Sequence, residues 1–188
     1  MTDEISGLPT RRAALRLLDT VMRMGTPMDQ ATANATKGLS PPDRALAIAI
    51  AQETLRWSVD LDALIDSKTK QPLPDDAKAR MVLRLALAQI LRLGTPAHAA
   101  IATALPLVDG GPRRLVHGVL GSLLRAEVKL PETPSLPETV MMRWHPVWGD
   151  DMIAGAQAAL AEPPPLDLAL RDPAQTAEWA ERLGGTSL

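Results

Sequence analysis

Cysteine, tyrosine and phenylalanine are absent from this sequence of 188 residues. Without cysteine the chain cannot form disulfides, bind zinc through thiolates or attack a substrate with a thiol. This absence fits a protein of the reducing cytoplasm, which is where we expect it. The aromatic residues are four tryptophans, so a platform for stacking single-stranded bases is largely excluded.

Long hydrophobic runs and recognisable catalytic motifs are also missing. No run approaches the roughly 20 apolar residues that span a bilayer, so no membrane association is expected. The three histidines, His98, His117 and His145, have no second ligand at metal-binding spacing. No glycine-rich phosphate loop and no nucleophile elbow is recognisable. We therefore expect neither catalytic residues nor a metal site, and predict that the chain acts by binding a partner.

The charges are divided unevenly along the chain. Residues 1–130 hold 17 Lys and Arg against 13 Asp and Glu, whereas residues 131–188 hold 3 against 9. Residues 1–130, which we call the body, are mildly basic, and the segment that follows them is acidic. This division is compatible with RNA binding by the body. An excess of four positive charges is also ordinary for a protein surface of this size. The charge alone therefore does not distinguish an RNA-binding surface from an ordinary one.

The residues that remain favour an all-α fold. Leu, Ile, Val, Ala and Met must form the core, and they repeat at helical spacing between Gly, Pro and capping residues. The clearest helix is predicted over 76–93, capped by Asp75, with an apolar face typical of a central core helix. Thr10 and Ser40 are predicted N-caps, and residues 110–112 a turn. The other helices of the body are predicted from Thr10 to Gly25 and over 28–37, 42–57, 59–66, 96–108 and 113–127.

The character of the sequence changes at residue 131. Pro131, Pro134 and Pro137 predict a linker or extended strap. A short helix is predicted over 150–161, an alternating strand over 166–172 and a final helix over 174–183. Because a single strand has nothing to pair with, we expect residues 131–188 to be a linker and the start of a second, α/β subdomain, distinct from the helical domain of residues 1–130.

Two groups of arginines are candidates for contacting RNA phosphates. Arg11, Arg12 and Arg16 lie within two turns of the first helix, and Arg113 and Arg114 follow the Gly-Gly-Pro segment at the start of a later one. Guanidinium groups at such spacing can bind successive phosphates. The competing interpretation is a solvated helix face. For Arg44 and Arg56 of the third helix, we favour a structural role that ties helices together.

Four segments together resemble a known family, namely residues 43–66, 82–108, 113–125 and 145–172. Their order and spacing are similar to the N-terminal part of the RsmB (Sun) family of bacterial small-subunit rRNA cytosine-5 methyltransferases. That part is itself similar to the antitermination factor NusB. The strongest match is LRLGTPAHAAI, where a Leu-rich helix ends in Gly and Pro-x-His-Ala-Ala opens the next. The last helix departs from the family, because HGVLG stands where Asn-Ala-Val-Leu-Arg is usual.

The resemblance implies an all-α NusB-like helical bundle that binds rRNA and helps to position it for methylation. It also implies that Arg11, Arg12 and Arg16 of the first helix are a main RNA contact. The methyltransferase domain of the family, with its S-adenosylmethionine site and attacking cysteine, has no counterpart in this chain, so no cofactor is expected here. The sequence leaves open whether the chain is a piece of a longer enzyme or a natural remnant.

Two other classes of function stay open. The first is a NusB-type antitermination adaptor that pairs with a protein partner or forms a homodimer. The second is a structural domain that only stabilises its neighbour. Binding to phosphates weakens steeply with salt, whereas a hydrophobic interface responds much less, so salt dependence separates RNA binding from these alternatives.

Overall fold

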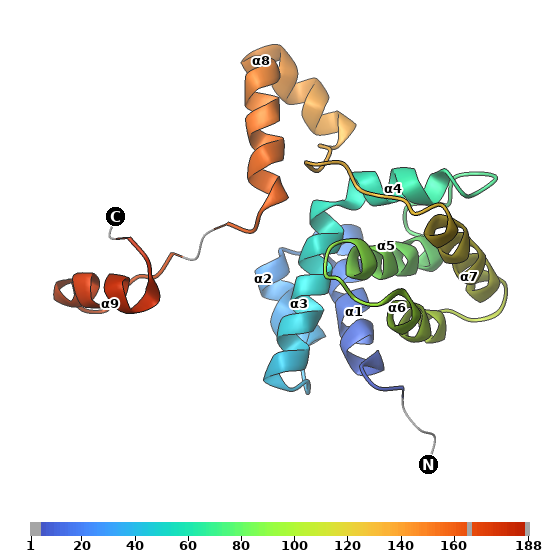
Figure 1. Ribbon diagram of the computed structural model, residues 1–188, viewed down its shortest axis with the longest axis horizontal. Helices are drawn as coiled ribbons and strands as arrows, with labels where there is room; N and C mark the ends of the chain where they lie inside the picture. The colour runs from blue at the N-terminus through green and yellow to red at the C-terminus, as the bar shows by residue number, and fades with distance from the viewer. Residues whose placement is uncertain (1–4, 165–166, 187–188) are drawn as a thin grey trace.

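The structure is a computed structural model, and it describes residues 5–164 and 167–186. These residues form helices and loops without a strand (Figure 1), which confirms the all-α prediction. The elements are α1 (Leu8–Met24), α2 (Met28–Ala35), α3 (Pro41–Arg56), α4 (Ser58–Asp66), α5 (Lys78–Leu91), α6 (Ala97–Ala104), η1 (Leu105–Leu107), α7 (Gly110–Arg125), α8 (Glu138–Ala161), η2 (Pro173–Gln175) and α9 (Thr176–Leu183).

Helix α5 is the centre of the body, as its apolar sequence predicted. Every residue from Ala79 to Gln89 is buried, and α1, α3, α4, α6 and α7 pack around it (Figure 1). A helix surrounded on all sides needs apolar residues all round rather than on one stripe. The predicted N-cap was wrong: Asp75 lies in a turn, and α5 begins at Lys78 after an extended Ala77.

Helix α1 packs on α2, α3 and α5 through its apolar stripe. It begins at Leu8, one turn earlier than predicted, because Gly7 adopts a left-handed conformation with φ 77°. Thr10 is therefore inside the helix and buried, and its hydroxyl donates to the Asp43 carboxylate at 2.9 Å. The cap predicted at Ser40 is confirmed, since its hydroxyl oxygen accepts the Asp43 N–H at 3.3 Å.

The Gly-Gly-Pro segment is not a separate turn. Asp109 occupies the N-cap position, and α7 starts at Gly110, so Pro112 falls in the first helical turn. Proline is tolerated there because the first N–H groups of a helix have no internal partner. This places Arg113 and Arg114 inside a helix of 16 residues.

The proline-rich segment 131–137 is an extended strap fixed to the body. Pro134 and Leu136 are buried, and Asp60 of α4 accepts hydrogen bonds from the Ser135 N–H at 2.9 Å and hydroxyl at 2.7 Å. The following helix starts at Glu138, twelve residues earlier than predicted. It consists of two helices that meet at Gly149, where φ is 72°.

The strand predicted over 166–172 was wrong. Residues 167–170 have no regular structure, and Leu166 lies outside the described residues. An isolated strand has no partner for its backbone groups, so nothing favours it over irregular backbone. Helix α9 packs mainly on η2 and lies apart from the other helices (Figure 1). The described residues thus show no α/β subdomain, and none of their helices is long and apolar enough to cross a membrane.

Candidate nucleic-acid interface

Helix α1 separates its apolar and charged residues by helical period. Ala13, Ala14, Leu17 and Leu18 are buried against the body. Arginines at positions 12, 16 and 23 follow the period of the opposite face and are exposed. The sequence therefore makes α1 carry cations on its solvent side while it packs with its other side.

Arg11 is turned away from this exposed row. Its Nε donates to Oε1 of Gln89 on α5 at 2.8 Å, and its Nη1 reaches the Gly7 carbonyl at 3.4 Å. Burial lowers the pKa of the Arg11 guanidinium, and the nearby Asp43 carboxylate opposes that change. Arg11 therefore ties α1 to α5, and the geometry does not bring it together with Arg12 and Arg16.

Arg12 and Arg16 line an open groove of about 440 Å³ between α1, the start of α5 and the segment that leads into α7. Both side chains are exposed, and Nη2 of Arg16 also donates to the Ala35 carbonyl at 3.0 Å. The groove carries cations and carboxylates together over an apolar floor. Its lining residues are Arg12, Leu15, Arg16, Asp19, Arg23, Asp76, Lys78, Met81, Pro106, Leu107 and Asp109.

The positive charge of the groove exceeds its negative charge. Four cations face three carboxylates, and one carboxylate, Asp19, is paired with Arg23 at 3.1 Å. That pair is exposed and one turn apart on the same helix, so it exchanges readily with solvent or with a ligand. Lys78 was not predicted as a site residue, because its position beside α1 follows from packing between helices distant in sequence.

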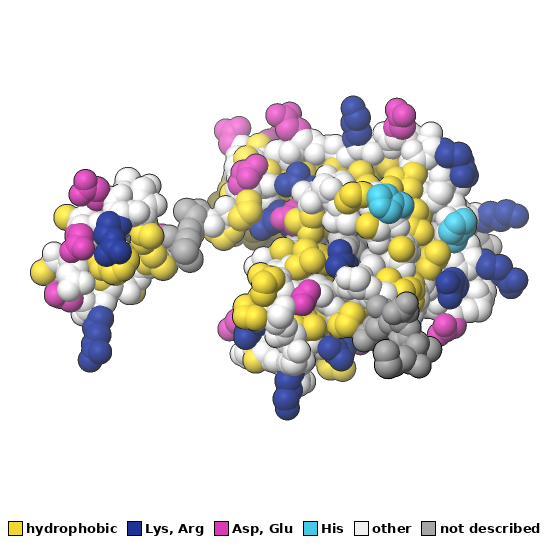
Figure 2. All heavy atoms as spheres, turned by 60° about the horizontal axis from the view of Figure 1, so that its bottom comes forward, with side chains coloured by type: hydrophobic (Ala, Val, Ile, Leu, Met, Phe, Trp, Pro, Cys, Tyr) yellow, Lys and Arg dark blue, Asp and Glu magenta, His cyan; other side chains and the backbone are white. Residues whose placement is uncertain are grey.

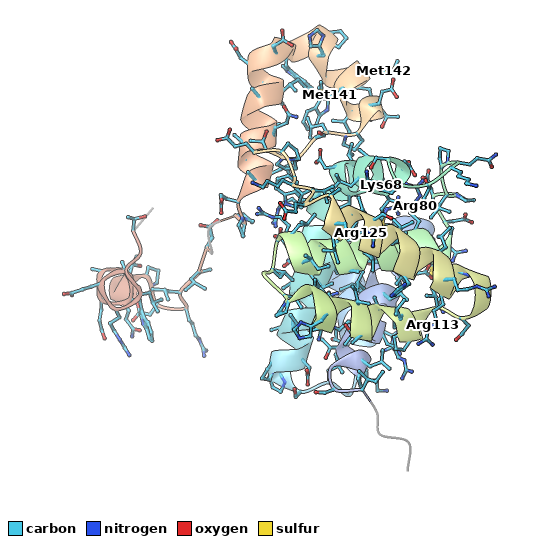
Figure 3. All side chains as sticks on the ribbon, turned by 45° about the vertical axis from the view of Figure 1, so that its right-hand side comes forward. Lys68, Arg80, Arg113, Arg125, Met141 and Met142 are labelled. Carbon is cyan, nitrogen blue, oxygen red and sulfur yellow. The ribbon has the colours of Figure 1, made fainter. Side chains whose placement is uncertain are left out.

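Arg113 and Arg114 lie outside the lining of this groove but close to it along the chain. Asp109, which lines the groove, is the N-cap residue of α7, and the two arginines follow within its first turn and a half. Both are exposed, and Figure 3 shows Arg113 at the outer end of α7. Figure 2 shows Lys and Arg side chains gathered along the edge of the helical body remote from α9.

The other arginines divide into structural and exposed ones. Arg56 pairs with Glu53 of its own helix, whereas Arg44 is exposed. The buried arginines that tie helices together are instead Arg80 and Arg84, 2% and 3% exposed, which bind carboxylates of α4. Their signal in the sequence was weak: two arginines within a mostly apolar helix, preceded by a helix with three aspartates.

The acidic and histidine side chains do not form a metal site among the described residues. Among the described residues, no three His, Asp or Glu side chains lie close enough to hold a metal ion. His145 contacts Asp150 at 2.9 Å across the Gly149 bend, and both side chains are exposed. The groove beside α1 is therefore the better candidate site.

Comparisons with known proteins agree on the helical body. The model of the NusB family matches residues 8–125. The ribosomal RNA small subunit methyltransferase B of Xanthomonas campestris pv. campestris is 32% identical over 122 residues, which are 64% of this chain and 28% of that protein. The chain thus spans little more than a quarter of that relative's length.

A solved structure has the same fold. A chain in the structure titled "Crystal Structure of a Plectonemic RNA Supercoil" superposes with a TM-score of 0.58 at 18% sequence identity. The superposition covers 64% of this chain and 94% of the other. At this identity the likeness extends to the fold alone.

Proposed function

The chain belongs to the NusB family, as the resemblance in its sequence indicated, and from this premise we propose that its helical body binds RNA. The groove beside α1 is the observation that carries the proposal. There, Arg12, Arg16, Arg23 and Lys78 come together on one open surface. Such a row of cations can neutralise successive phosphates and release their counterions, which is the main source of affinity for a nucleic acid.

The chemistry of the groove favours contacts to the RNA backbone over contacts to stacked bases. None of its lining residues is aromatic, so base stacking contributes nothing there. Arginine can form two parallel hydrogen bonds to a phosphate. Contacts of this kind recognise the shape of a folded RNA, because they follow the path of its backbone. The resemblance to rRNA-modifying proteins supports a folded RNA as the ligand.

More specifically, we propose that the body positions small-subunit rRNA for cytosine-5 methylation, as one domain of a cytoplasmic methyltransferase. The name of the 32% identical relative supports this role. Residues 1–130 would be the RNA-binding domain and 131–188 the connection toward the methyltransferase part. We propose that the S-adenosylmethionine site and the attacking cysteine belong to the methyltransferase part, because the described residues contain no strand and the chain has no cysteine. Methyl transfer would therefore depend on residues outside this chain.

The test is binding of the chain to a small-subunit rRNA fragment at about 50 and 200 mM salt. A variant with Arg12→Ala, Arg16→Ala and Arg23→Ala removes three cations of the groove. We expect wild-type binding that weakens steeply with salt, and a variant with lower affinity and a salt slope smaller by about 2. Arg11 is left unchanged because its side chain holds α1 on α5.

The matched control changes Arg143, Arg171 and Arg182 of the C-terminal segment to Ala, which removes the same net charge away from the groove. We expect it to bind like the wild type. Absence of wild-type binding at the lower salt, or equal losses in the two variants, would contradict the groove as an RNA site. A protein ligand whose binding is insensitive to salt would favour the adaptor function instead.

A further inference from the structure

Helix α7 has a charge pattern that the groove does not explain. Its 16 residues, GGPRRLVHGVLGSLLR, contain three arginines, one histidine and no carboxylate. The first acidic residues on either side are Asp109 before it and Glu127 after it. Its apolar residues Val116, Val119 and Leu120 are buried against the body together with Leu123. The outward side of the helix therefore carries positive charge only.

Four residues share a narrow stripe along that outward side. At 100° per residue, Arg114, Gly118, Gly121 and Arg125 lie within about 60° of one another, opposite the buried face. Arg114 and Arg125 are about 17 Å apart along the helix axis at 1.5 Å per residue. Figure 3 shows Arg113 and Arg125 at the two ends of α7. The stripe thus has a cation at each end and two glycines between them.

The glycines are not required by the backbone. Both lie inside a continuous helix and have no positive φ, and a Cβ added to Gly118 would meet nothing within 4 Å. Glycine weakens a helix relative to alanine, so these positions reduce helix stability without serving a turn. At Gly118 this leaves bare backbone on the surface, where another chain can approach closely. At Gly121 the guanidinium of Arg125 folds back over this surface, where its Nη2 donates to the Ser122 hydroxyl at 3.2 Å.

Close approach between two cationic ends suits a sugar–phosphate backbone. The helix itself offers no carboxylate to repel phosphates or to neutralise the arginines. The stripe also begins about one and a half helical turns beyond Asp109, which both lines the groove and precedes α7 as its N-cap residue. One RNA strand leaving the groove at Asp109 would therefore meet Arg113 and Arg114 next.

We propose that the outward face of α7 is a second RNA-backbone surface, which continues the groove beside α1 over about 17 Å. Arg113, Arg114 and Arg125 bind phosphates, and the glycine stripe lets the ribose–phosphate chain lie against the helix. This inference rests on the proposed RNA binding. The RNA would run from the groove onto α7 and make a second set of contacts there. The chain would therefore cover a longer stretch of RNA than the groove alone could hold.

The test uses the full chain and the same rRNA fragment, with salt dependence as the readout. The face variant carries Arg113→Gln, Arg114→Gln and Arg125→Gln, since glutamine is a good helix former. Its charge-matched control carries the Gln substitution at Arg143, Arg171 and Arg182. We expect the face variant alone to lose affinity, with a salt slope smaller by about 2.

A second variant removes no charge. Gly118→Gln places a side chain on the bare stripe, and we expect it to raise the thermal unfolding temperature while it weakens RNA binding. A face variant and a Gly118→Gln variant that both bind like the wild type would overturn the inference. If the groove variant with Arg12, Arg16 and Arg23 changed still lost affinity, the proposed function would stand. Absence of wild-type binding would instead remove the proposed function and this inference together.

Discussion

Arg84 of α5 and Asp62 of α4 form a bidentate ion pair. The Arg84 Nε donates to Oδ1 at 2.7 Å, and its Nη2 donates to Oδ2 at 2.6 Å. Arg80, one turn earlier, joins the same carboxylate at 2.9 Å and binds Asp66 at 2.6 Å. Burial acts to lower the pKa of Arg80, but its hydrogen bonds to Asp62 and Asp66 raise that pKa above the ordinary value. Two almost fully buried guanidinium groups thus fasten α4 to the central helix.

Removing the shared carboxylate should destabilise the body. In an Asp62→Ala variant Arg84 stays buried and keeps only the exposed Asp75 carboxylate at 4.0 Å. Removing one partner of a buried ion pair costs about 3–5 kcal/mol. Because Asp62 is 24% exposed and Arg80 keeps Asp66, we expect a loss near the lower end, about 3 kcal/mol. Urea unfolding followed by circular dichroism measures it. The control is Asp19→Ala, which breaks an exposed pair and should cost less than about 1 kcal/mol; equal losses would contradict the structural role of Asp62.

Removing the Asp60 carboxylate should release the strap 131–137. It accepts both the N–H and the hydroxyl of Ser135, and hydrogen bonds to a charged group contribute about 1.5–3 kcal/mol each. We expect Asp60→Ala to raise amide hydrogen exchange at Ser135 and its neighbours by about tenfold or more. Glu132→Ala in the same strap changes an exposed side chain and should leave that exchange unchanged. Protection that persists without Asp60 would show that Pro134 and Leu136 hold the strap by packing alone.

The Asp43 carboxylate should make stability depend on pH in the acid range. Hydrogen bonds from Ser40 and Thr10 lower its pKa below 3.8, the ordinary value for Asp. A pKa lowered by folding means that the ionised form favours the folded state, so this stabilisation is present above about pH 5 and is lost as the pH falls through the lowered pKa. We expect the difference in unfolding free energy between the wild type and Asp43→Asn to shrink between about pH 5 and pH 2. A difference that stays constant over this range would exclude titration of Asp43 as its cause.

Replacing Gly118 by alanine should stabilise the chain. The residue lies inside α7 with open space at its Cβ position, and alanine is favoured over glycine in a helix by about 0.5–1 kcal/mol. We expect a rise of that size in the unfolding free energy, measured by urea denaturation. Gly94→Ala is the contrasting change, because its φ of 63° strains any other side chain. Destabilisation at position 118 would mean that α7 tolerates no side chain there.

The helices, and the face of α1 that bears its arginines, could be predicted from the sequence. Both follow from local rules, since apolar residues at helical period mark the buried side and leave Arg12 and Arg16 outside. The predictions from the sequence were wrong where local signals compete. Asp75 resembled an N-cap but stands three residues before the first residue of α5. The alternating residues of 166–172 resembled a strand, although strands depend on partners elsewhere in the chain.

Tertiary packing alone decided which cations share a site. Arg11 and Arg12 are neighbours in sequence, but consecutive residues point about 100° apart on a helix, so one reaches Gln89 of α5 and the other the open groove. Lys78 and Asp109 enter that groove from segments far along the chain, whose positions depend on how α5 and α6 pack against α1. Local periodicity therefore determined the helices and their faces, whereas the groove exists only because long-range packing brings those faces together.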